Sequence, residues 1–258
     1  MDILIPVIII AVIGLIAGLG LSFASKYMAV PVDETEVKLR EVLPGANCGA
    51  CGFSGCDGYA AALAKGEAKP NLCSPGGDTT AKAIGEILKI EVESNPKIAL
   101  IACNNSCDKT KRAFAYEGLQ SCTAAALLQG GPLDCKYGCI GLLDCLNACP
   151  FNAIIVNNGH PTVCGDLCKG CGLCVNTCPK GIIKLVPKDY KTAVLCNNKE
   201  KGAPVVQACQ SSCLACTMCE RTCEKGAIKV IDNLAQIDYE LCDGCGKCKE
   251  VCKRKVII

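Results

Sequence analysis

Apolar positions run without interruption along the first part of the chain. The segment from Ile3 to Ala24 (ILIPVIIIAVIGLIAGLGLSFA) carries no charged residue. A run of that length can cross a bilayer as a helix, so residues 1–25 are predicted to form a transmembrane anchor. A cleaved signal peptide is the alternative, because Ser22-Phe23-Ala24 resembles a cleavage site; however, no basic residue precedes the run, and the run is long for a signal peptide.

Charges around this segment predict its orientation. Lys26, Lys38 and Arg40 follow the segment, and no Lys or Arg precedes it. The positive-inside rule then predicts a single-pass protein of the inner (cytoplasmic) membrane with its soluble part on the cytoplasmic side. The Gly14-x-x-x-Gly18 spacing would allow another helix to approach closely.

Beyond the apolar segment, polar and apolar positions alternate in shorter patterns. Residues 26–43 are mostly polar and are predicted to be a partly helical tether. GYAAALAKGEA has the composition of a short helix that ends near Gly66. Residues 78–134 form a predicted linker domain, in which TAKAIGEILKIEVE indicates an amphipathic helix and KIALIAC a buried strand. The predicted fold class is therefore α+β.

Composition adds the decisive chemistry, since 26 of the 258 residues are cysteine and only one is histidine. Most cysteines are separated by two or three residues, which suits several thiolates around one metal centre and suits a disulfide framework poorly. The formal charge of +2 gives no strong bias toward nucleic acid or acidic lipid.

The first cysteine group lies in a glycine-rich domain predicted for residues 44–77. Glycine allows the backbone to wrap closely round a metal centre and to direct N–H groups at its sulfurs. The group favours a [4Fe–4S] cluster, with structural zinc as the alternative. Its cysteines are Cys48, Cys51, Cys56 and Cys73.

The rest of the chain contains an internal repeat, which we name unit 1 (135–190) and unit 2 (191–258). Moving residues 122–178 forward by 74 positions superposes nine cysteines, too many for chance. The matched pairs are Cys122 with Cys196, Cys135 with Cys209, Cys139 with Cys213, Cys145 with Cys219, Cys149 with Cys223, Cys168 with Cys242, Cys171 with Cys245, Cys174 with Cys248 and Cys178 with Cys252.

Unit 2 has the spacing of bacterial two-cluster ferredoxins, in which the fourth cysteine of each run binds the other cluster. Two such runs at this separation are highly specific for [4Fe–4S] clusters. The predicted ligand sets are Cys213, Cys216, Cys219 and Cys252 for one cluster, and Cys242, Cys245, Cys248 and Cys223 for the other.

Unit 1 departs from this pattern because Leu142 stands where Cys216 has its counterpart. We expect Cys135 to supply the missing ligand, with a three-cysteine [3Fe–4S] cluster as the alternative. The predicted sets are Cys135, Cys139, Cys145 and Cys178, and Cys168, Cys171, Cys174 and Cys149. Five [4Fe–4S] clusters are thus expected in the chain.

Six cysteines lie outside these ligand sets. Cys103-Asn104-Asn105 resembles Cys196-Asn197-Asn198, so a sixth metal site is one interpretation, and reduced, buried thiols are the other. The remaining members are Cys107, Cys122, Cys164 and Cys209. The chain has no dinucleotide-binding or P-loop motif, and His160 is interpreted as a turn residue, so no substrate-converting site and no catalytic residue is predicted.

The order of these features resembles the B subunit of the Rnf complex, a membrane-bound ferredoxin:NAD⁺ oxidoreductase. The local matches are LPGANCGACGFSGCDGYA, the AAALLQGGPLDCKYGCIG stretch ending in CPFNAI, and CKGCGLCVNTCPKGII. The resemblance covers nearly the whole chain. It implies an electron-relay subunit that accepts electrons from reduced ferredoxin and passes them to other membrane subunits of an ion-translocating oxidoreductase.

Basic residues near the end of unit 2 suggest where ferredoxin docks. An acidic ferredoxin would be attracted to Lys247, Lys249, Lys253, Arg254 and Lys255, although these could equally be solvated surface. Three other functions stay open: a free-standing membrane-anchored polyferredoxin, a subunit of a related complex that reduces a redox-sensing transcription factor, and a zinc-rich structural adaptor.

Overall fold

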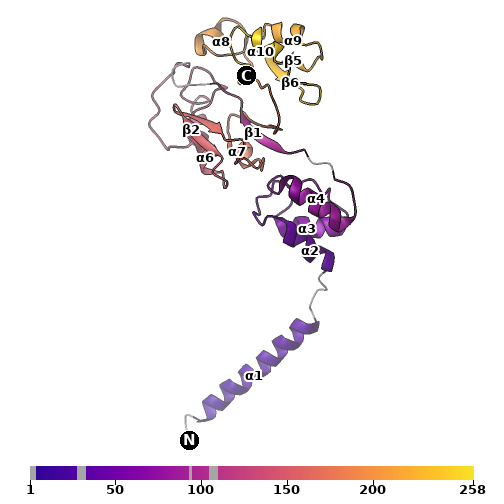
Figure 1. Ribbon diagram of the computed structural model, residues 1–258. Coiled ribbons are helices and arrows are strands. Elements are labelled where there is room, and N and C mark those ends of the chain that lie inside the picture. Colours follow the sequence, from indigo (N-terminus) through magenta and orange to yellow (C-terminus); the bar gives the residue numbers. More distant parts are fainter. Residues whose placement is uncertain (1–3, 28–32, 93–94, 105–109) are drawn as a thin grey trace.

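The computed structural model of the chain describes residues 4–27, 33–92, 95–104 and 110–258. Its first helix, α1 (Leu4–Tyr27), stands apart from the other elements in Figure 1. Val12, Leu15 and Leu19 are each at least half exposed on it. Across these described segments, no helix meets the length and apolar character required of a membrane span. Ile3, where the expected span begins, lies outside the described residues.

Three helices form the N-terminal domain: α2 (Glu34–Val42), α3 (Cys56–Ala64) and α4 (Gly77–Leu88). Helix α2 begins after Asp33, whose carboxylate accepts a hydrogen bond from the Thr35 backbone N–H at 2.8 Å. Leu39, Tyr59 and Ile84, one from each helix, are almost fully buried against one another. Helices α3 and α4 lie in the two segments predicted as a short helix and an amphipathic helix, and α2 lies in the segment predicted as a partly helical tether. Helix α4 ends where Lys89 turns left-handed.

Unit 1 is built on two small sheets. Strand β1 (Lys97–Ile101) pairs antiparallel with β4 (Ile183–Pro187), and β2 (Ile154–Asn157) pairs with β3 (His160–Val163). Strand β1 is the predicted buried strand, and it brings a segment from the predicted linker into the core of unit 1. The short helices here are α5 (Cys122–Ala126), α6 (Asp144–Asn147) and α7 (Leu173–Thr177).

Unit 2 repeats this arrangement 74 residues later. Its hairpin of β5 (Ile228–Ile231) and β6 (Leu234–Ile237) has the same register as the β2–β3 hairpin. An isolated bridge between Val194 and Ile257 takes the place of the β1–β4 pair. The helices of this unit are α8 (Ala203–Ala208), α9 (Met218–Thr222) and α10 (Lys247–Glu250). Figure 1 shows unit 2 at the end of the molecule farthest from α1. Helices and strands are mixed in units 1 and 2, in agreement with the α+β prediction.

Candidate metal centres

The four cysteines of the N-terminal domain converge. Burial raises the pKa of the Cys73 thiol, and the nearby thiolates of Cys56, Cys51 and Cys48 raise it further, so all four side chains lie close together. Tyr59 closes the loop that carries Cys73, because its hydroxyl donates to the Lys69 carbonyl at 2.6 Å and accepts from the Leu72 N–H at 3.2 Å.

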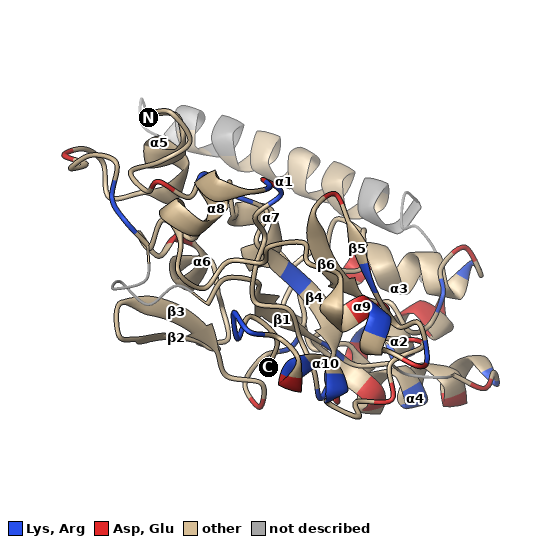
Figure 2. Ribbon diagram, turned by 90° about the horizontal axis from the view of Figure 1, so that it is seen from above, with Lys and Arg blue, Asp and Glu red and all other residues tan. Residues whose placement is uncertain are grey.

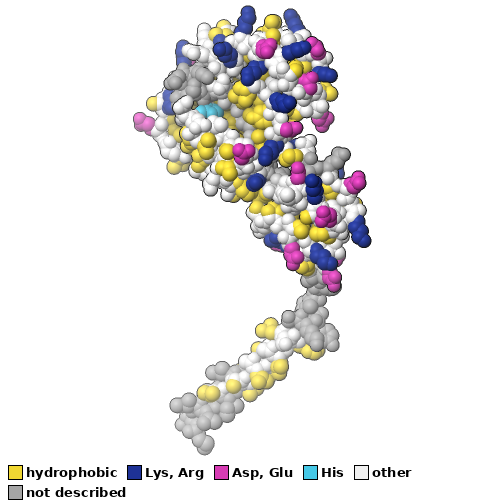
Figure 3. Space-filling view, viewed as in Figure 1, with side chains coloured by type: hydrophobic (Ala, Val, Ile, Leu, Met, Phe, Trp, Pro, Cys, Tyr) yellow, Lys and Arg dark blue, Asp and Glu magenta, His cyan; other side chains and the backbone are white. Residues whose placement is uncertain are grey.

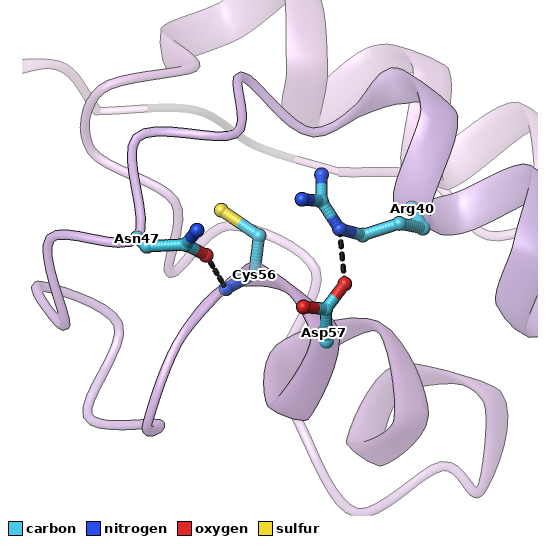
Figure 4. Close-up of polar contacts among 4 residues, drawn as sticks. All are labelled: Arg40, Asn47, Cys56 and Asp57. Carbon is cyan, nitrogen blue, oxygen red and sulfur yellow. Dashed lines mark hydrogen bonds and ion pairs between the residues drawn. The ribbon is translucent and has the colours of Figure 1, made fainter.

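Figure 4 shows how the first turn of α3 is held beside these cysteines. The Asn47 side-chain oxygen accepts a hydrogen bond from the Cys56 backbone N–H at 2.8 Å, and Arg40 forms an ion pair with Asp57. A Cβ atom at Gly55 would lie only 3.0 Å from the Asn47 oxygen. Glycine is therefore what lets the Asn47 loop close over the start of the helix.

In unit 1, one small cavity is ringed by four thiols. The Cys168 sulfur accepts a hydrogen bond from the Ala99 N–H at 3.3 Å, and the Cys149 sulfur accepts one from the Ala153 N–H at 3.4 Å. Backbone N–H groups directed at sulfur are the usual surroundings of an iron–sulfur cluster. The thiols are those of Cys149, Cys168, Cys171 and Cys174, the same four that the crossover spacing groups together.

Unit 2 has a matching small cavity, lined by Cys223, Cys242, Cys245 and Cys248. The other predicted set lies in the adjoining core, where Cys213 and Cys219 are buried and Cys252 packs against them. The neighbouring thiolates of Cys213 and Cys216, together with burial as the larger cause, raise the pKa of Cys219 to about 11.

The second cavity of unit 1 differs from the predicted set. Its lining includes Cys139, Cys145 and Cys178 as expected, but the fourth cysteine is Cys122 and not Cys135. Helix α5 carries Cys122 to this place because the Asp144 carboxylate, at the start of α6, accepts hydrogen bonds from the Ser121 hydroxyl at 2.9 Å and the Thr123 N–H at 3.2 Å.

Cys135 does not line this cavity, which differs from the expectation that it completes the set with Cys139. Its buried thiol faces Cys209 and Glu200. Sequence spacing favoured Cys135 because it is nearer to Cys139 along the chain. The signal that could have identified Cys122 is the serine before it, a helix N-cap that ties α5 to Asp144.

All four cysteine loops of units 1 and 2 follow one backbone path that the sequence analysis missed. Each loop ends in two cysteines that are four positions apart. The residues four and two positions before the first of these two cysteines have positive φ, and so does the residue three positions after the second. The loop containing Leu142 keeps this path although it lacks one cysteine. The residues are Gly141, Leu143 and Asn152; Gly170, Gly172 and Gly181; Ala215, Thr217 and Gly226; and Gly244, Gly246 and Lys255.

Burial sets the electrostatics of these thiols. It raises the pKa of Cys174 to about 12 and that of Cys145 to about 11, and it also raises the pKa of Cys139. A buried thiol without metal is therefore neutral at pH 7, whereas an iron ligand is a thiolate, so loading with metal must release protons.

Within the described segments, no three His, Cys, Asp or Glu side chains are arranged to hold a single metal ion. A [4Fe–4S] cluster takes its thiolates at the corners of a cube, and the four-cysteine cavities have that chemistry: sulfur ligands, backbone N–H donors and apolar walls. Of the remaining cysteines, Cys103 accepts a hydrogen bond from the Cys139 N–H at 3.5 Å, Cys164 is half-buried, and Cys107 lies outside the described residues.

Comparison with known proteins agrees with this chemistry. The FeS family model for an Fe-S cluster domain matches residues 43–75, and the Fer4 model, described as a 4Fe-4S binding domain, matches residues 165–184 and 235–258. The Fer4 matches cover only the second cysteine run of each unit. The first runs, one of which contains Leu142, fall outside them.

Three curated relatives are similar over most of the chain. The B subunit of the Na⁺-translocating ferredoxin:NAD⁺ oxidoreductase complex of Acetobacterium woodii is 40% identical, with 99% of this chain and 77% of the relative covered. The B subunit of the proton-translocating ferredoxin:NAD⁺ oxidoreductase complex of Clostridium ljungdahlii is 41% identical (93% and 86% covered). The B subunit of the ion-translocating oxidoreductase complex of Methanosarcina acetivorans is 36% identical (96% and 95%). The chain therefore belongs to the family of B subunits of ion-translocating oxidoreductase complexes.

Proposed function

We propose that this chain is the relay subunit of a membrane-bound ion-translocating ferredoxin:NAD⁺ oxidoreductase, accepting electrons from reduced ferredoxin at unit 2 and passing them toward the membrane subunits. The observation that carries the proposal is that three thiol-lined cavities lie in units 1 and 2 and that four further thiols converge in the N-terminal domain. Each [4Fe–4S] cluster, when bound, takes up and releases one electron.

The cavities and the core support five proposed ligand sets. Relative to the sequence prediction, one assignment changes: Cys122 replaces Cys135 beside Cys139. The proposed sets are Cys48, Cys51, Cys56 and Cys73; Cys122, Cys139, Cys145 and Cys178; Cys149, Cys168, Cys171 and Cys174; Cys213, Cys216, Cys219 and Cys252; and Cys223, Cys242, Cys245 and Cys248.

Charge effects between thiols of different sets support an order for the relay. Cys48 of the N-terminal domain lies close enough to Cys171 for its charge to raise the pKa of that thiol. Cys145 acts in the same way on Cys174, which joins the two cavities of unit 1. In the proposed relay, the N-terminal centre therefore exchanges electrons with the second cysteine run of unit 1.

Exposure supports unit 2 as the entry point for electrons. Cys216 and Cys245 are the described cysteines whose residues are exposed, and both belong to unit 2. Lys and Arg positions are visible along α9 and α10 in Figure 2, and basic side chains surround this end of the molecule in Figure 3. An acidic protein would be steered to such a surface.

Four of the five basic residues predicted to attract ferredoxin are exposed on this surface. Lys247, Lys249, Lys253 and Lys255 are exposed, with Lys247 forming a 2.5 Å ion pair with Glu224. Arg254 is instead engaged inside the unit, where its guanidinium donates to the Cys209 carbonyl at 2.8 Å. We therefore expect the four lysines, and not Arg254, to attract ferredoxin.

The docking test replaces these four lysines with glutamine in the assembled complex. We expect ferredoxin oxidation to slow about tenfold at low ionic strength, with the difference shrinking as salt screens the attraction. A matched control replaces four exposed lysines of the N-terminal domain, Lys65, Lys69, Lys82 and Lys89, and should leave the rate unchanged. Equal rates and equal salt dependence for both variants would exclude docking at unit 2.

Assembly is tested by purification from membranes through a tag on this chain. We expect other redox subunits of the complex to co-purify with it in fixed stoichiometry. Recovery of the chain alone, brown and competent to oxidise ferredoxin, would indicate a free-standing polyferredoxin. A colourless chain that contains zinc would exclude electron transfer.

The N-terminal helix is proposed to be the membrane anchor. Support comes from the uncharged sequence of residues 3–24 and from α1, a continuous helix of 24 residues with exposed apolar side chains. Removal of residues 3–24 should move the chain from the membrane to the soluble fraction. The cytoplasmic side is checked by protease added to inverted vesicles, which should digest units 1 and 2. Protection of both units in that experiment would reverse the proposed topology.

A further inference from the structure

One of the two thiol-lined cavities of unit 1 also has a lysine in its wall. We name this cavity the inner centre, and its thiols are those of Cys122, Cys139, Cys145 and Cys178. The lysine is Lys180, which stands two positions after Cys178 and is only partly exposed. A cationic side chain therefore forms part of the wall of a site that the proposed function fills with thiolates.

Hydrogen bonds hold Lys180 in place at both its side chain and its backbone. The ammonium group donates to the Gly130 carbonyl at 2.6 Å, in the segment that follows α5, the helix that carries Cys122. The Asn197 side chain of unit 2 donates to the Lys180 carbonyl at 3.3 Å. Lys180 is therefore held between the segments that supply Cys122 and Cys178, in contact with unit 2.

The lysines in the walls of the other two thiol-lined cavities are exposed. Lys169 lines the second cavity of unit 1, and Lys225 and Lys247 line the cavity of unit 2. Lys247 is also paired with Glu224. Because water and salt screen exposed charges more than partly buried ones, Lys180 has the least screened charge of the four lysines. We name the second cavity of unit 1 the outer centre, and its thiols are those of Cys149, Cys168, Cys171 and Cys174.

The charge of Lys180 is not balanced by a carboxylate in the part of the chain that the structure describes. No Asp or Glu oxygen there lies within ion-pair distance of its ammonium group. A partly buried charge is costly unless an opposite charge lies nearby. Iron-bound thiolates would supply that charge, because a [4Fe–4S] centre with four thiolates is negative and becomes more negative when it is reduced.

We propose that Lys180 raises the reduction potential of the inner centre above that of the outer centre, so that unit 1 holds an arriving electron at the inner centre. The ammonium charge stabilises the reduced form more than the oxidised form, because the reduced form is more negative. One electron leaves a reduced centre of unit 2, which is oxidised, and reduces the inner centre, with no bond made or broken. This inference rests on the five-cluster function proposed above.

The first test is a redox titration of the full-length, anaerobically purified protein, followed by low-temperature EPR. K180Q should move one of the five reduced-cluster components to lower potential. We expect the equilibrium constant for reduction of that component to fall about tenfold, which is about 59 mV for a one-electron couple. K180R keeps the charge and should stay close to the unmodified chain. The matched control K169Q removes an exposed lysine from the outer centre and should move its component far less.

The outcomes of this titration separate the inference from the proposed function. An unchanged titration of K180Q, or an equal shift in K169Q, would overturn the role of Lys180 while leaving the five clusters intact. Iron far below about twenty per chain in the unmodified protein, with no reduced-cluster signal, would overturn the proposed function itself.

A second comparison needs no lysine variant, so it decides the matter even if K180Q loses its inner cluster. C145S should remove the component of the inner centre, and C171S should remove that of the outer centre. The component missing from C145S should be the one reduced at the higher potential. Equal potentials or the reverse order would overturn the proposal, and so would retention of all five components in C145S.

Discussion

Unit 1 and unit 2 have the same framework but different cysteines on it. The hairpins have the same register, and the positive-φ residues fall at equivalent places in all four loops. Yet unit 1 has Leu142 where unit 2 has Cys216, and it takes a thiol from α5 instead. Unit 2 exposes two cysteines, whereas the described cysteines of unit 1 are all at least half-buried. The comparison shows that the loop conformation does not depend on a full set of local cysteines. It also shows that two units with the same framework can differ in how far their cysteines are exposed to solvent.

The largest expected effect comes from breaking the unusual ligand set of unit 1. C122S should lose one cluster, about four iron per chain, because Cys122 is the fourth thiol that lines this cavity. Adding L142C to that variant restores the spacing of unit 2 on a backbone that already has the required conformation, so the iron should return. Iron analysis and low-temperature EPR of the reduced proteins measure both changes.

The single variant L142C is the control for this experiment and should bind the same amount of iron as the unmodified chain. Full iron content in C122S would show that Cys122 is not a ligand. Failure of L142C to restore iron, after its loss in C122S, would show that the two loops differ in more than their cysteines.

A smaller effect on stability is expected from substitution of Gly170 in unit 1 and of its counterpart Gly244 in unit 2. A Cβ atom at Gly170 would lie 2.2 Å from the Lys97 carbonyl oxygen in β1, whereas one at Gly244 would meet the side chain of Lys191, 2.7 Å away, which can move. We expect G244A to lower the free energy of unfolding by about 1 kcal/mol, the cost of left-handed strain alone. G170A should lower it by about 3 kcal/mol, because the added Cβ atom also overpacks against backbone. Thermal unfolding of the iron-loaded proteins ranks them.

G66A supplies the reference for left-handed strain without a neighbour, since Gly66 also has positive φ but open space around it. Its unfolding temperature should fall about as much as that of G244A. Equal decreases for G170A and G66A would mean that β1 yields readily, and that unit 1 is no more tightly enclosed than unit 2.

The smallest expected effect concerns the histidine of unit 1. His160 occupies the hairpin position that Leu234 occupies in unit 2, and its buried Nε2 atom has no hydrogen-bond partner. Burial lowers the pKa of the imidazole. The folded state therefore resists protonation while the unfolded state accepts it below pH about 6.5, so stability falls as pH decreases through that range.

H160L should remove this pH dependence and stabilise the protein by about 1 kcal/mol, because it also removes an unsatisfied polar atom. The difference in unfolding temperature between the variant and the unmodified chain is measured at pH about 8 and at pH about 6. Any loss of stability in acid that both proteins share does not affect this difference. A difference that does not grow toward low pH would show that His160 is protonated in the folded protein.

Regular spacing made much of the molecule predictable. The 74-residue repeat, the helices of the N-terminal domain, the β1 strand and the grouping of Cys149 with the run from Cys168 all follow from residue patterns. These features are local or repeat a known spacing. The left-handed residues were harder to predict from the sequence, because Leu, Ala and Thr, which stand at positions 143, 215 and 217, rarely adopt this conformation.

The place of Cys122 could not be read from spacing because a tertiary contact decides it. The Asp144 carboxylate draws α5 against α6, and the two segments are 21 residues apart at their nearest hydrogen bond. The use of Arg254 was hidden for the same reason, since its partners Cys209 and Ser212 lie more than 40 residues earlier. Where hydrogen bonds join segments that are distant in the sequence, spacing along the chain does not predict which side chains lie together.

The pairing of β1 with β4 also has a consequence for biosynthesis. Ile101 and its partner Ile183 are 82 positions apart. At a translation rate of about 5–20 residues per second, β1 waits several seconds for its partner to be made. During that interval the N-terminal domain can already close, because its helices need only residues up to Leu88. We expect iron insertion to follow the same order, with the Cys48–Cys73 centre assembled on the nascent chain before unit 1 is complete.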